Sequence, residues 1–133
     1  MNENLKSPLQ MLDHWVKHKG GEIYLRQPIN GVYINFTWRQ VKQQAEQVAG
    51  ALRHLGFRPG ENIAILSKNC AEWFITDLAL MMGGYVSVPI YPTANAKTIK
   101  YILEHSESKA IFVGKLDSWA EQSSAIGSEV MRL

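Results

Sequence analysis

The sequence is poor in cysteine and has little excess of either charge. Cys70 is the only cysteine among 133 residues, so no internal disulfide can form, and a lone thiol fits a reducing compartment. The 14 Lys and Arg and the 12 Asp and Glu are scattered and give a formal net charge of +2, without the basic stripe of nucleic-acid-binding proteins. We therefore expect a cytoplasmic location and no nucleic-acid partner.

Hydrophobic segments that would target or anchor the chain are also lacking. Residues 1–6 show no apolar run behind a basic head, so we expect no signal peptide. The longest apolar stretch, residues 73–91, contains Asp77, two glycines and Pro89, which favour a core helix followed by a strand over a membrane span. Peripheral contact with a membrane stays open. The composition, 46% hydrophobic and 20% charged, is typical of one globular unit with a buried core.

The chain is organised around residues 61–92, which predict strand, helix and strand with little connecting chain. Residues 61–67 are apolar and rich in β-branched side chains, and they follow the turn pair Pro59-Gly60, as in a strand buried on both faces. Residues 85–90 repeat this pattern. Two parallel strands joined by a helical crossover are the expected result.

The connecting helix is predicted over residues 71–82. Asn69 is expected to cap it, with Glu72 as the capping-box partner, and Gly84 is expected to end it. Large apolar side chains are distributed around most of its circumference, so we expect the helix to be buried: Trp73, Phe74, Ile75, Leu78, Leu80 and Met81.

Two helices and a hairpin are predicted before this unit. Ser7 as cap and Pro8 at the first helical position begin an N-terminal helix. Asn30-Gly31 provides turn chemistry for a β-hairpin between residues 22–26 and 32–36. A long amphipathic helix begins after Thr37, which caps it with Gln40 as its box partner, and its apolar face consists of Val41, Ala45, Val48, Ala49, Leu52 and Leu55.

The alternation of strands and helices continues after the central unit. We expect a helix over residues 95–105, a third buried strand over residues 110–113 and a short helix from Asp117 or Ser118 to Ala125. The fold class is therefore α/β, with a parallel β-α-β-α-β unit over about residues 61–114.

Individual reactive side chains give few signs of chemistry. His14 and His18 have metal-ligand spacing, but Trp15 stands where a zinc protease motif needs Glu and no third ligand is evident, so we assign no metal site. Cys70 is interpreted as a small structural residue in a first helical turn. Asp77 is interpreted as a paired or partly exposed structural carboxylate, because no second acid or His lies at helical spacing from it.

Short motifs occur in a fixed order along most of the chain: Thr37-Trp38, Leu55-Gly56, residues 59–66, residues 69–73, residues 88–93 and Tyr101-Ile102-Leu103. Together they resemble the N-terminal part of the AMP-binding, adenylate-forming enzymes. The resemblance extends roughly from Leu9 to Val113. The Val-Pro-Ile-Tyr-Pro-Thr ending is most similar to the long-chain acyl-CoA synthetase branch, that is, the long-chain fatty acid CoA ligases.

The resemblance implies a parent enzyme that uses ATP, Mg²⁺ and coenzyme A to convert a fatty acid into acyl-CoA, AMP and pyrophosphate through acyl-AMP. The Ser/Thr/Gly-rich phosphate loop and later motifs of that family have no match here, so we assign no catalytic, cofactor-binding or metal-binding residue. Residues 1–133 are then expected to be a truncated piece of the N-terminal domain, part of a larger domain, without the C-terminal part. We expect this piece to be an inactive scaffold that binds no cofactor tightly.

Self-association is expected as well, because the fragment would expose an unpaired strand edge if residues 110–113 normally pair with missing sequence, and apolar surface if the buried helices lose their cover. Two other interpretations of function stay open. The parent could be another acyl-adenylating enzyme, either a carrier-protein ligase or a peptide-synthetase adenylation domain. The chain could instead be a stand-alone binding or assembly module of the same fold, without catalysis.

Ligands of open parallel sheets collect at the carboxyl ends of the strands, which here means residues 67–69, 91–93 and 114–115. The family resemblance implies that the loop matching Tyr91, Pro92 and Thr93 lies near the pantetheine channel of coenzyme A. These three residues are the only candidate substrate-channel site. A proline-fixed connector without ligand contact is the alternative interpretation.

Overall fold

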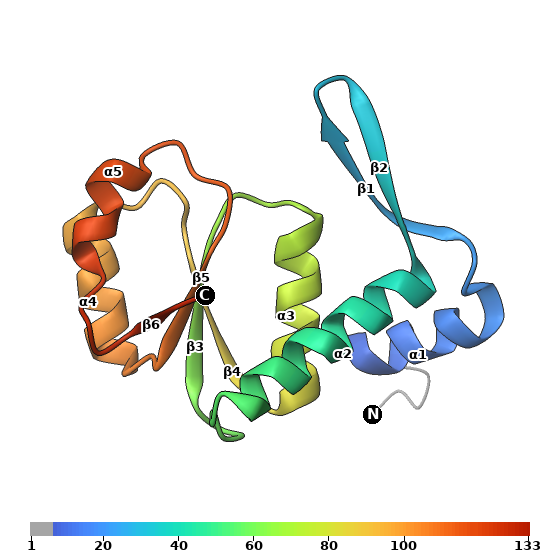
Figure 1. Cartoon of the computed structure of the whole chain (residues 1–133), viewed down its shortest axis with the longest axis horizontal. Coiled ribbons are helices and arrows are strands. Elements are labelled where there is room, and N and C mark those ends of the chain that lie inside the picture. The colour runs from blue at the N-terminus through green and yellow to red at the C-terminus, as the bar shows by residue number, and fades with distance from the viewer. Residues whose placement is uncertain (1–6) are drawn as a thin grey trace, which may run out of the picture.

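The computed structural model describes residues 7–133 and has the predicted α/β fold. The expectation that the chain begins without a signal peptide falls on residues 1–6, outside the described part. A parallel sheet lies between helices on its two faces, and a β-hairpin stands away from it (Figure 1). In the part of the chain that the structure describes, no helix has both the length and the hydropathy needed to cross a membrane.

The N-terminal elements are α1 (Pro8–Lys19), β1 (Ile23–Ile29), β2 (Val32–Thr37) and α2 (Trp38–His54). Both predicted helix starts are confirmed, because each has a complete capping box. In the second box the Thr37 hydroxyl accepts a hydrogen bond from the Gln40 backbone amide at 3.1 Å, and Oε1 of Gln40 accepts one from the Thr37 backbone amide at 2.9 Å. The strands pair antiparallel across the predicted Asn-Gly turn. Leu55 is 51% exposed, so its assignment to the apolar face of α2 was wrong, because the helix has already ended at this residue.

The parallel sheet has the strand order β4-β3-β5-β6. Its strands are β3 (Asn62–Leu66), β4 (Val86–Ile90), β5 (Ala110–Val113) and β6 (Met131–Arg132). The first three confirm the predicted β-α-β-α-β unit. The crossovers are α3 (Ala71–Gly83), α4 (Ala96–Ser106), and α5 (Trp119–Gln122) with the 3₁₀ turn η1 (Ser123–Ala125).

The short strand β6 was missed because two residues carry no readable periodicity. It pairs with the first half of β5, and Leu133 continues the contact by donating its amide to the Ile111 carbonyl at 2.9 Å. The edge of β5 is therefore covered, and the premise that this strand offers an unpaired edge was wrong.

The central strand β3 is buried on both faces, as predicted. Ile63 and Ile65 pack with Leu52 of α2 and Leu80 of α3 on one face. Ala64 and Leu66 pack on the other face with residues from α4 and β5, including Ile99, Leu103 and Ile111. Side chains of a strand alternate between its faces, so one short strand joins the two layers of the core.

The start of α3 differs from the prediction. Cys70, not Asn69, is the N-cap residue, and no side chain of the cap residue bonds to the helix. The Ala71 amide instead donates to Oε1 of Gln27 on β1 at 2.9 Å. The hairpin thus satisfies a free amide of the first turn, which removes the need for a local cap.

The expected burial of α3 holds for one side of the helix only. Ile75, Leu78 and Leu80 are buried, whereas Phe74 is 43% exposed and Trp73 is half-buried. Phe74 lines a shallow hollow together with residues of β1. The helix ends as predicted at Gly84, which has the left-handed φ of 76° that favours glycine.

Candidate functional site

The carboxyl ends of β3, β4 and β5 meet at one edge of the sheet, because the three strands are parallel. Backbone and hydroxyl groups join the loops after β3 and β5 there. The Ser67 hydroxyl accepts from the Lys115 amide at 3.0 Å and donates to the Lys68 carbonyl at 2.9 Å. The Lys68 amide donates to the Lys115 carbonyl at 2.8 Å. A side chain at Gly114 would clash with the Ser67 hydroxyl, so this junction is tightly packed.

A cavity of about 280 Å³ lies at this edge, between the end of β4 and the first turn of α3. Its lining residues are Ser67, Asn69, Trp73, Pro89, Ile90, Tyr91 and Pro92. Two of the three candidate site residues, Tyr91 and Pro92, therefore line one cavity, whereas Thr93 does not. Tyr91 is 82% exposed, so its ring is available to a ligand.

Trp73 is the cavity residue that sequence reasoning did not select as a site residue. The pattern indicated only a buried helix, and Trp73 was included among its core residues. A usable signal did exist. Trp73 lies in the first turn after β3, and the first turn of such a crossover helix lies at the carboxyl edge of a parallel sheet.

The loop after β4 is a turn with fixed hydrogen bonds. The Ala94 amide donates to the Tyr91 carbonyl at 3.0 Å, and Pro92 fixes φ inside the turn. Nε2 of Gln122 donates to the carbonyls of Pro92 and Ala94 at 2.8 and 2.9 Å. The turn that forms this wall of the cavity is thus held by a hydrogen bond within the loop and by two hydrogen bonds from Gln122.

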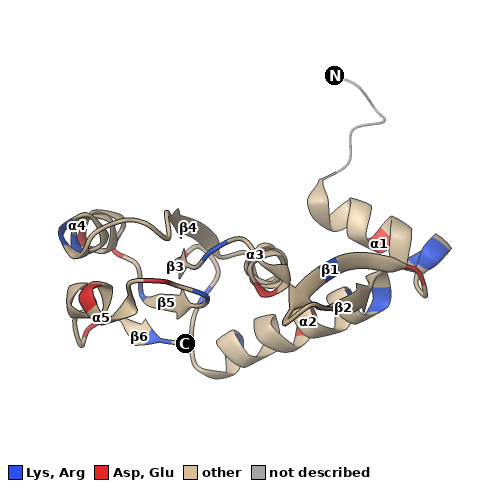
Figure 2. Ribbon diagram, turned by 90° about the horizontal axis from the view of Figure 1, so that it is seen from above, with Lys and Arg blue, Asp and Glu red and all other residues tan. Residues whose placement is uncertain are grey.

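Charged groups do not form a cradle for phosphates at this edge. Lys68 lies 2.6 Å from the Asp117 carboxylate, and both side chains are well exposed. An exposed ion pair of this kind contributes about 0 to 1 kcal/mol. Along the ribbon of residues 7–133, Lys and Arg positions are interspersed with Asp and Glu positions (Figure 2).

The described residues contain no group of three or more His, Cys, Asp or Glu side chains that could hold a metal ion. The His14 and His18 rings lie with their centroids 4.5 Å apart on α1. Cys70 is buried, with its sulfur 3.9 Å from the Ser67 hydroxyl, and Asp77 is half-buried on α3.

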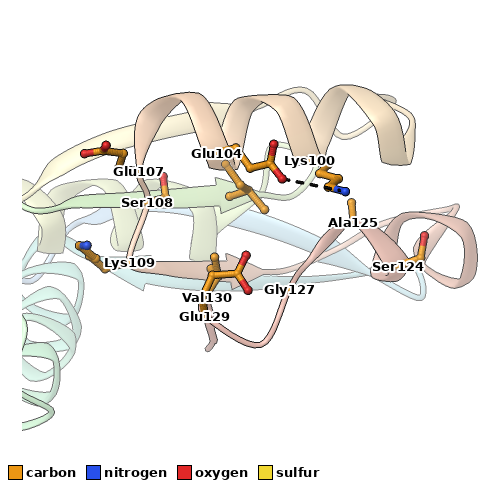
Figure 3. Close-up of a pocket in the computed structure, with 11 residues that line it drawn as sticks. Lys100, Glu104, Glu107, Ser108, Lys109, Ser124, Ala125, Gly127, Glu129 and Val130 are labelled. Carbon is orange, nitrogen blue, oxygen red and sulfur yellow. Dashed lines mark ion pairs between the residues drawn. The ribbon is translucent and has the colours of Figure 1, made fainter.

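A larger cavity of about 700 Å³ lies elsewhere, between α4 and the segment from η1 to β6 (Figure 3). Charges of both signs line it, including Lys100, Glu104, Lys109 and Glu129, and the amine of Lys100 lies 4.0 Å from the Glu104 carboxylate. Ser108 and Lys109 directly precede β5, so this cavity lies toward the amino end of that strand. Ligands of parallel sheets bind at the opposite edge, and we assign no site here.

Comparison with known proteins agrees with the observed fold. The family model described as AMP-binding enzyme matches residues 12–131. The chain belongs to the AMP-binding enzyme family. Enzymes of this adenylate-forming family use ATP, and the matched residues include every motif on which the family resemblance was based.

Two curated relatives are named as long-chain acyl-CoA ligases. The chain is 32% identical over 105 residues to the long-chain-fatty-acid–CoA ligase FadD15 of Mycobacterium bovis. This alignment covers 79% of this chain and 17% of the relative. It is 30% identical over 115 residues to long chain acyl-CoA synthetase 2 of Arabidopsis thaliana, with 83% and 17% covered. The aligned part of the chain thus spans about a sixth of the length of either relative.

Solved structures show the same fold at lower identity. An anthranilate CoA ligase, AuaEII, in complex with anthranoyl-AMP has a TM-score of 0.80 at 22% identity, over 92% of this chain and 24% of that chain. An artificially fused adenylation-PCP di-domain of a peptide synthetase from Klebsiella oxytoca has a TM-score of 0.76 at 22% identity, over 97% and 23%. The chain therefore matches part of the adenylate-forming fold.

Proposed function

We propose that this chain is the N-terminal scaffold portion of an ATP-dependent long-chain fatty acid CoA ligase. Such an enzyme joins a fatty acid to coenzyme A through acyl-AMP and releases AMP and pyrophosphate. The observation that supports the proposal is the identity of 30 to 32%, over about four fifths of the chain, to proteins named as long-chain acyl-CoA ligases.

The scaffold role follows from what the described residues offer. They hold the carboxyl edge of the sheet rigid through the Ser67 junction and the turn at Tyr91. They contain no group of three or more His, Cys, Asp or Glu side chains that could hold a metal ion. In the proposed enzyme, the residues that bind ATP and Mg²⁺ for adenylation lie outside this chain.

The loop Tyr91-Pro92-Thr93 is proposed as part of the path by which the coenzyme A thiol reaches acyl-AMP. Three features support this: the loop leaves β4 at the carboxyl edge, Tyr91 and Pro92 line a cavity, and Trp73 adds an aromatic face to it. An aromatic ring with a free face can pack against the narrow pantetheine arm. Pro89 and Pro92 restrict the backbone on either side of Tyr91, so little order has to be gained on binding.

The test compares two half-reactions of a complete enzyme that carries this chain as its N-terminal part. Tyr91→Ala should slow thioester formation about ten- to thirty-fold, equivalent to about 1 to 2 kcal/mol, and leave acyl-AMP formation nearly unchanged. Pyrophosphate exchange measures adenylation. Tyr91→Phe keeps the ring and should retain most of the thiol-dependent rate.

Tyr101→Ala is a matched control, because Tyr101 is also an exposed tyrosine, at 64%, but lies on α4 and lines no part of the cavity. Equal losses in both half-reactions of Tyr91→Ala, or no loss in either, would mean that Tyr91 is only a connector. The melting temperatures of the variants show whether a loss of rate reflects unfolding.

A second candidate function is an adenylating enzyme that delivers its acyl group to a carrier protein. The likeness to the adenylation-PCP di-domain supports this candidate, although identity of 22% supports the fold alone. The choice of acceptor separates the two. A complete enzyme that forms a thioester with coenzyme A from a long-chain acid supports the first proposal, and one that transfers only to a carrier protein supports the second. If neither adenylation nor transfer occurs, a non-catalytic binding or assembly module becomes the better interpretation.

A further inference from the structure

Gln122 is a fully buried polar side chain whose two amide hydrogens serve one loop. It is 0% exposed and lies at the end of α5. Nε2 donates to the Pro92 carbonyl at 2.8 Å and to the Ala94 carbonyl at 2.9 Å. Its Oε1 is also buried and has no hydrogen-bond partner among residues 7–133. An unpaired buried acceptor is unfavourable, so the stabilising hydrogen bonds of this side chain are those made by its donor side.

The loop that receives these two hydrogen bonds follows β4 directly and contains Pro92. Tyr91 is 82% exposed, so packing of its ring does not fix the segment. Within the loop, the Ala94 amide bonds to the Tyr91 carbonyl at 3.0 Å. Gln122 adds two bonds from a residue that lies 28 and 30 positions away in the sequence. These long-range bonds connect the turn to α5.

The segment that carries Gln122 is itself anchored at both ends. Oε1 of Glu121 accepts from the Ala96 amide in the first turn of α4 at 3.0 Å. Arg132 on β6 donates to the Ser123 carbonyl at 3.2 Å, and its guanidinium lies 5.7 Å from the centre of the Trp119 ring. The segment that carries Gln122 is thus connected to the sheet through Arg132 of β6, and the position of the Gln122 amide is fixed by these contacts.

We propose that Gln122 is a positioning residue whose amide holds the turn of residues 91–94, so that Tyr91 and Pro92 form the wall of the cavity beside Trp73. By holding this wall, Gln122 sets the path of the coenzyme A thiol. The statement about the turn stands on the hydrogen bonds alone, whereas the statement about the thiol rests on the proposed function.

The first experiment measures the turn in the chain itself. Gln122→Met keeps the length of the side chain and removes both donors, and Gln122→Glu keeps the shape and places an oxygen against the two carbonyls. Hydrogen exchange of the Ala94 amide should become about tenfold faster in both variants, while exchange in β3 stays unchanged. Ser124→Ala is the control, because its hydroxyl bonds only within the same segment, to the Glu121 carbonyl at 3.0 Å.

The second experiment repeats the half-reactions with Gln122→Met in a complete enzyme. Thioester formation should fall about tenfold with adenylation unchanged, a split that general loss of stability would not produce. Unchanged exchange at Ala94 would overturn the inference. So would equal losses in both half-reactions, no loss in either, or loss of the folded state in both variants. Failure of the unsubstituted enzyme to form any thioester would instead overturn the proposed function, and the exchange data would still decide whether Gln122 holds the turn.

Discussion

Helix α3 carries large apolar side chains that differ sharply in burial, which allows a paired test of what holds the scaffold together. Leu80 is 0% exposed and packs with Ile63, Ile65 and Tyr85 between the helix and the sheet. Phe74, on the same helix, is 43% exposed. Truncation to alanine removes more atoms from Phe74 than from Leu80, so side-chain size and burial predict opposite orders of effect.

Leu80→Ala should lower the free energy of unfolding by about 3 to 5 kcal/mol, because it removes buried methyl groups and leaves a cavity in a packed cluster. Phe74→Ala should cost less than about 1.5 kcal/mol, because its side chain is already 43% exposed and the truncation removes less buried apolar surface. In a domain of this size the first change corresponds to a fall in melting temperature of about 10 °C or more.

Urea denaturation of the chain followed by circular dichroism measures both values, provided that the transition is two-state. Both substitutions introduce alanine in the same helix, so helix propensity changes little between them. A loss for Phe74→Ala equal to or greater than that for Leu80→Ala would refute the burial argument. It would mean that Phe74 is covered, for instance by another copy of the chain.

Three further predictions concern local structure and association. Thr37→Ala should cost about 1 kcal/mol because it removes the cap of α2, and Thr37→Ser should restore most of it, as thermal melts would show. Gly84→Ala should destabilise by about 1 to 3 kcal/mol because of its φ of 76°, whereas Gly50→Ala, in open space on α2, should stabilise by about 0.5 to 1 kcal/mol; stabilisation at both positions would contradict the assigned backbone. Self-association, if it occurs, should involve the exposed apolar side chains of the hairpin, where Val32 and Tyr33 are 65% and 64% exposed, since β5 is covered. Light scattering at high concentration should show more than a monomer that Val32→Lys reduces, and a pure monomer would count against it.

Features that depend on neighbouring residues were predictable from the sequence. The capping boxes at Ser7 and Thr37, the turn at Asn30 and the glycine stop at Gly84 all act within a few residues, and the structure confirms them. The strand β3 was equally clear, because a strand buried on both faces needs an unbroken apolar run.

Features that depend on distant residues were not predictable. The start of α3 is satisfied by Gln27, 44 positions earlier, so the local signal at Asn69 pointed to the wrong cap. Phe74 was predicted to lie in the core, because the sequence alone does not show which side of a helix packs against another element. The buried Gln122 side chain donates to the Pro92 carbonyl, 30 positions earlier in the sequence. No pattern in the residues around Gln122 indicates this contact.

The candidate site shows the same division. Parallel strands place their carboxyl ends together, so Ser67 and Tyr91 could be assigned to one edge from the strand order alone. The cavity itself depends on how far Trp73 turns toward that edge, which is a matter of packing. Thr93 follows Pro92 directly in the sequence but lies outside the cavity lining, which the strand order does not indicate.

Calorimetric titration of the chain with ATP and Mg²⁺ tests the central claim most directly, namely that this part of the enzyme is a scaffold without its own nucleotide site. Among the described residues no group of three or more His, Cys, Asp or Glu side chains could hold a metal ion, and the Lys68 amine at the carboxyl edge is paired with the Asp117 carboxylate at 2.6 Å. The account predicts no saturable heat of binding at micromolar concentrations of nucleotide. A dissociation constant in the micromolar range would contradict it.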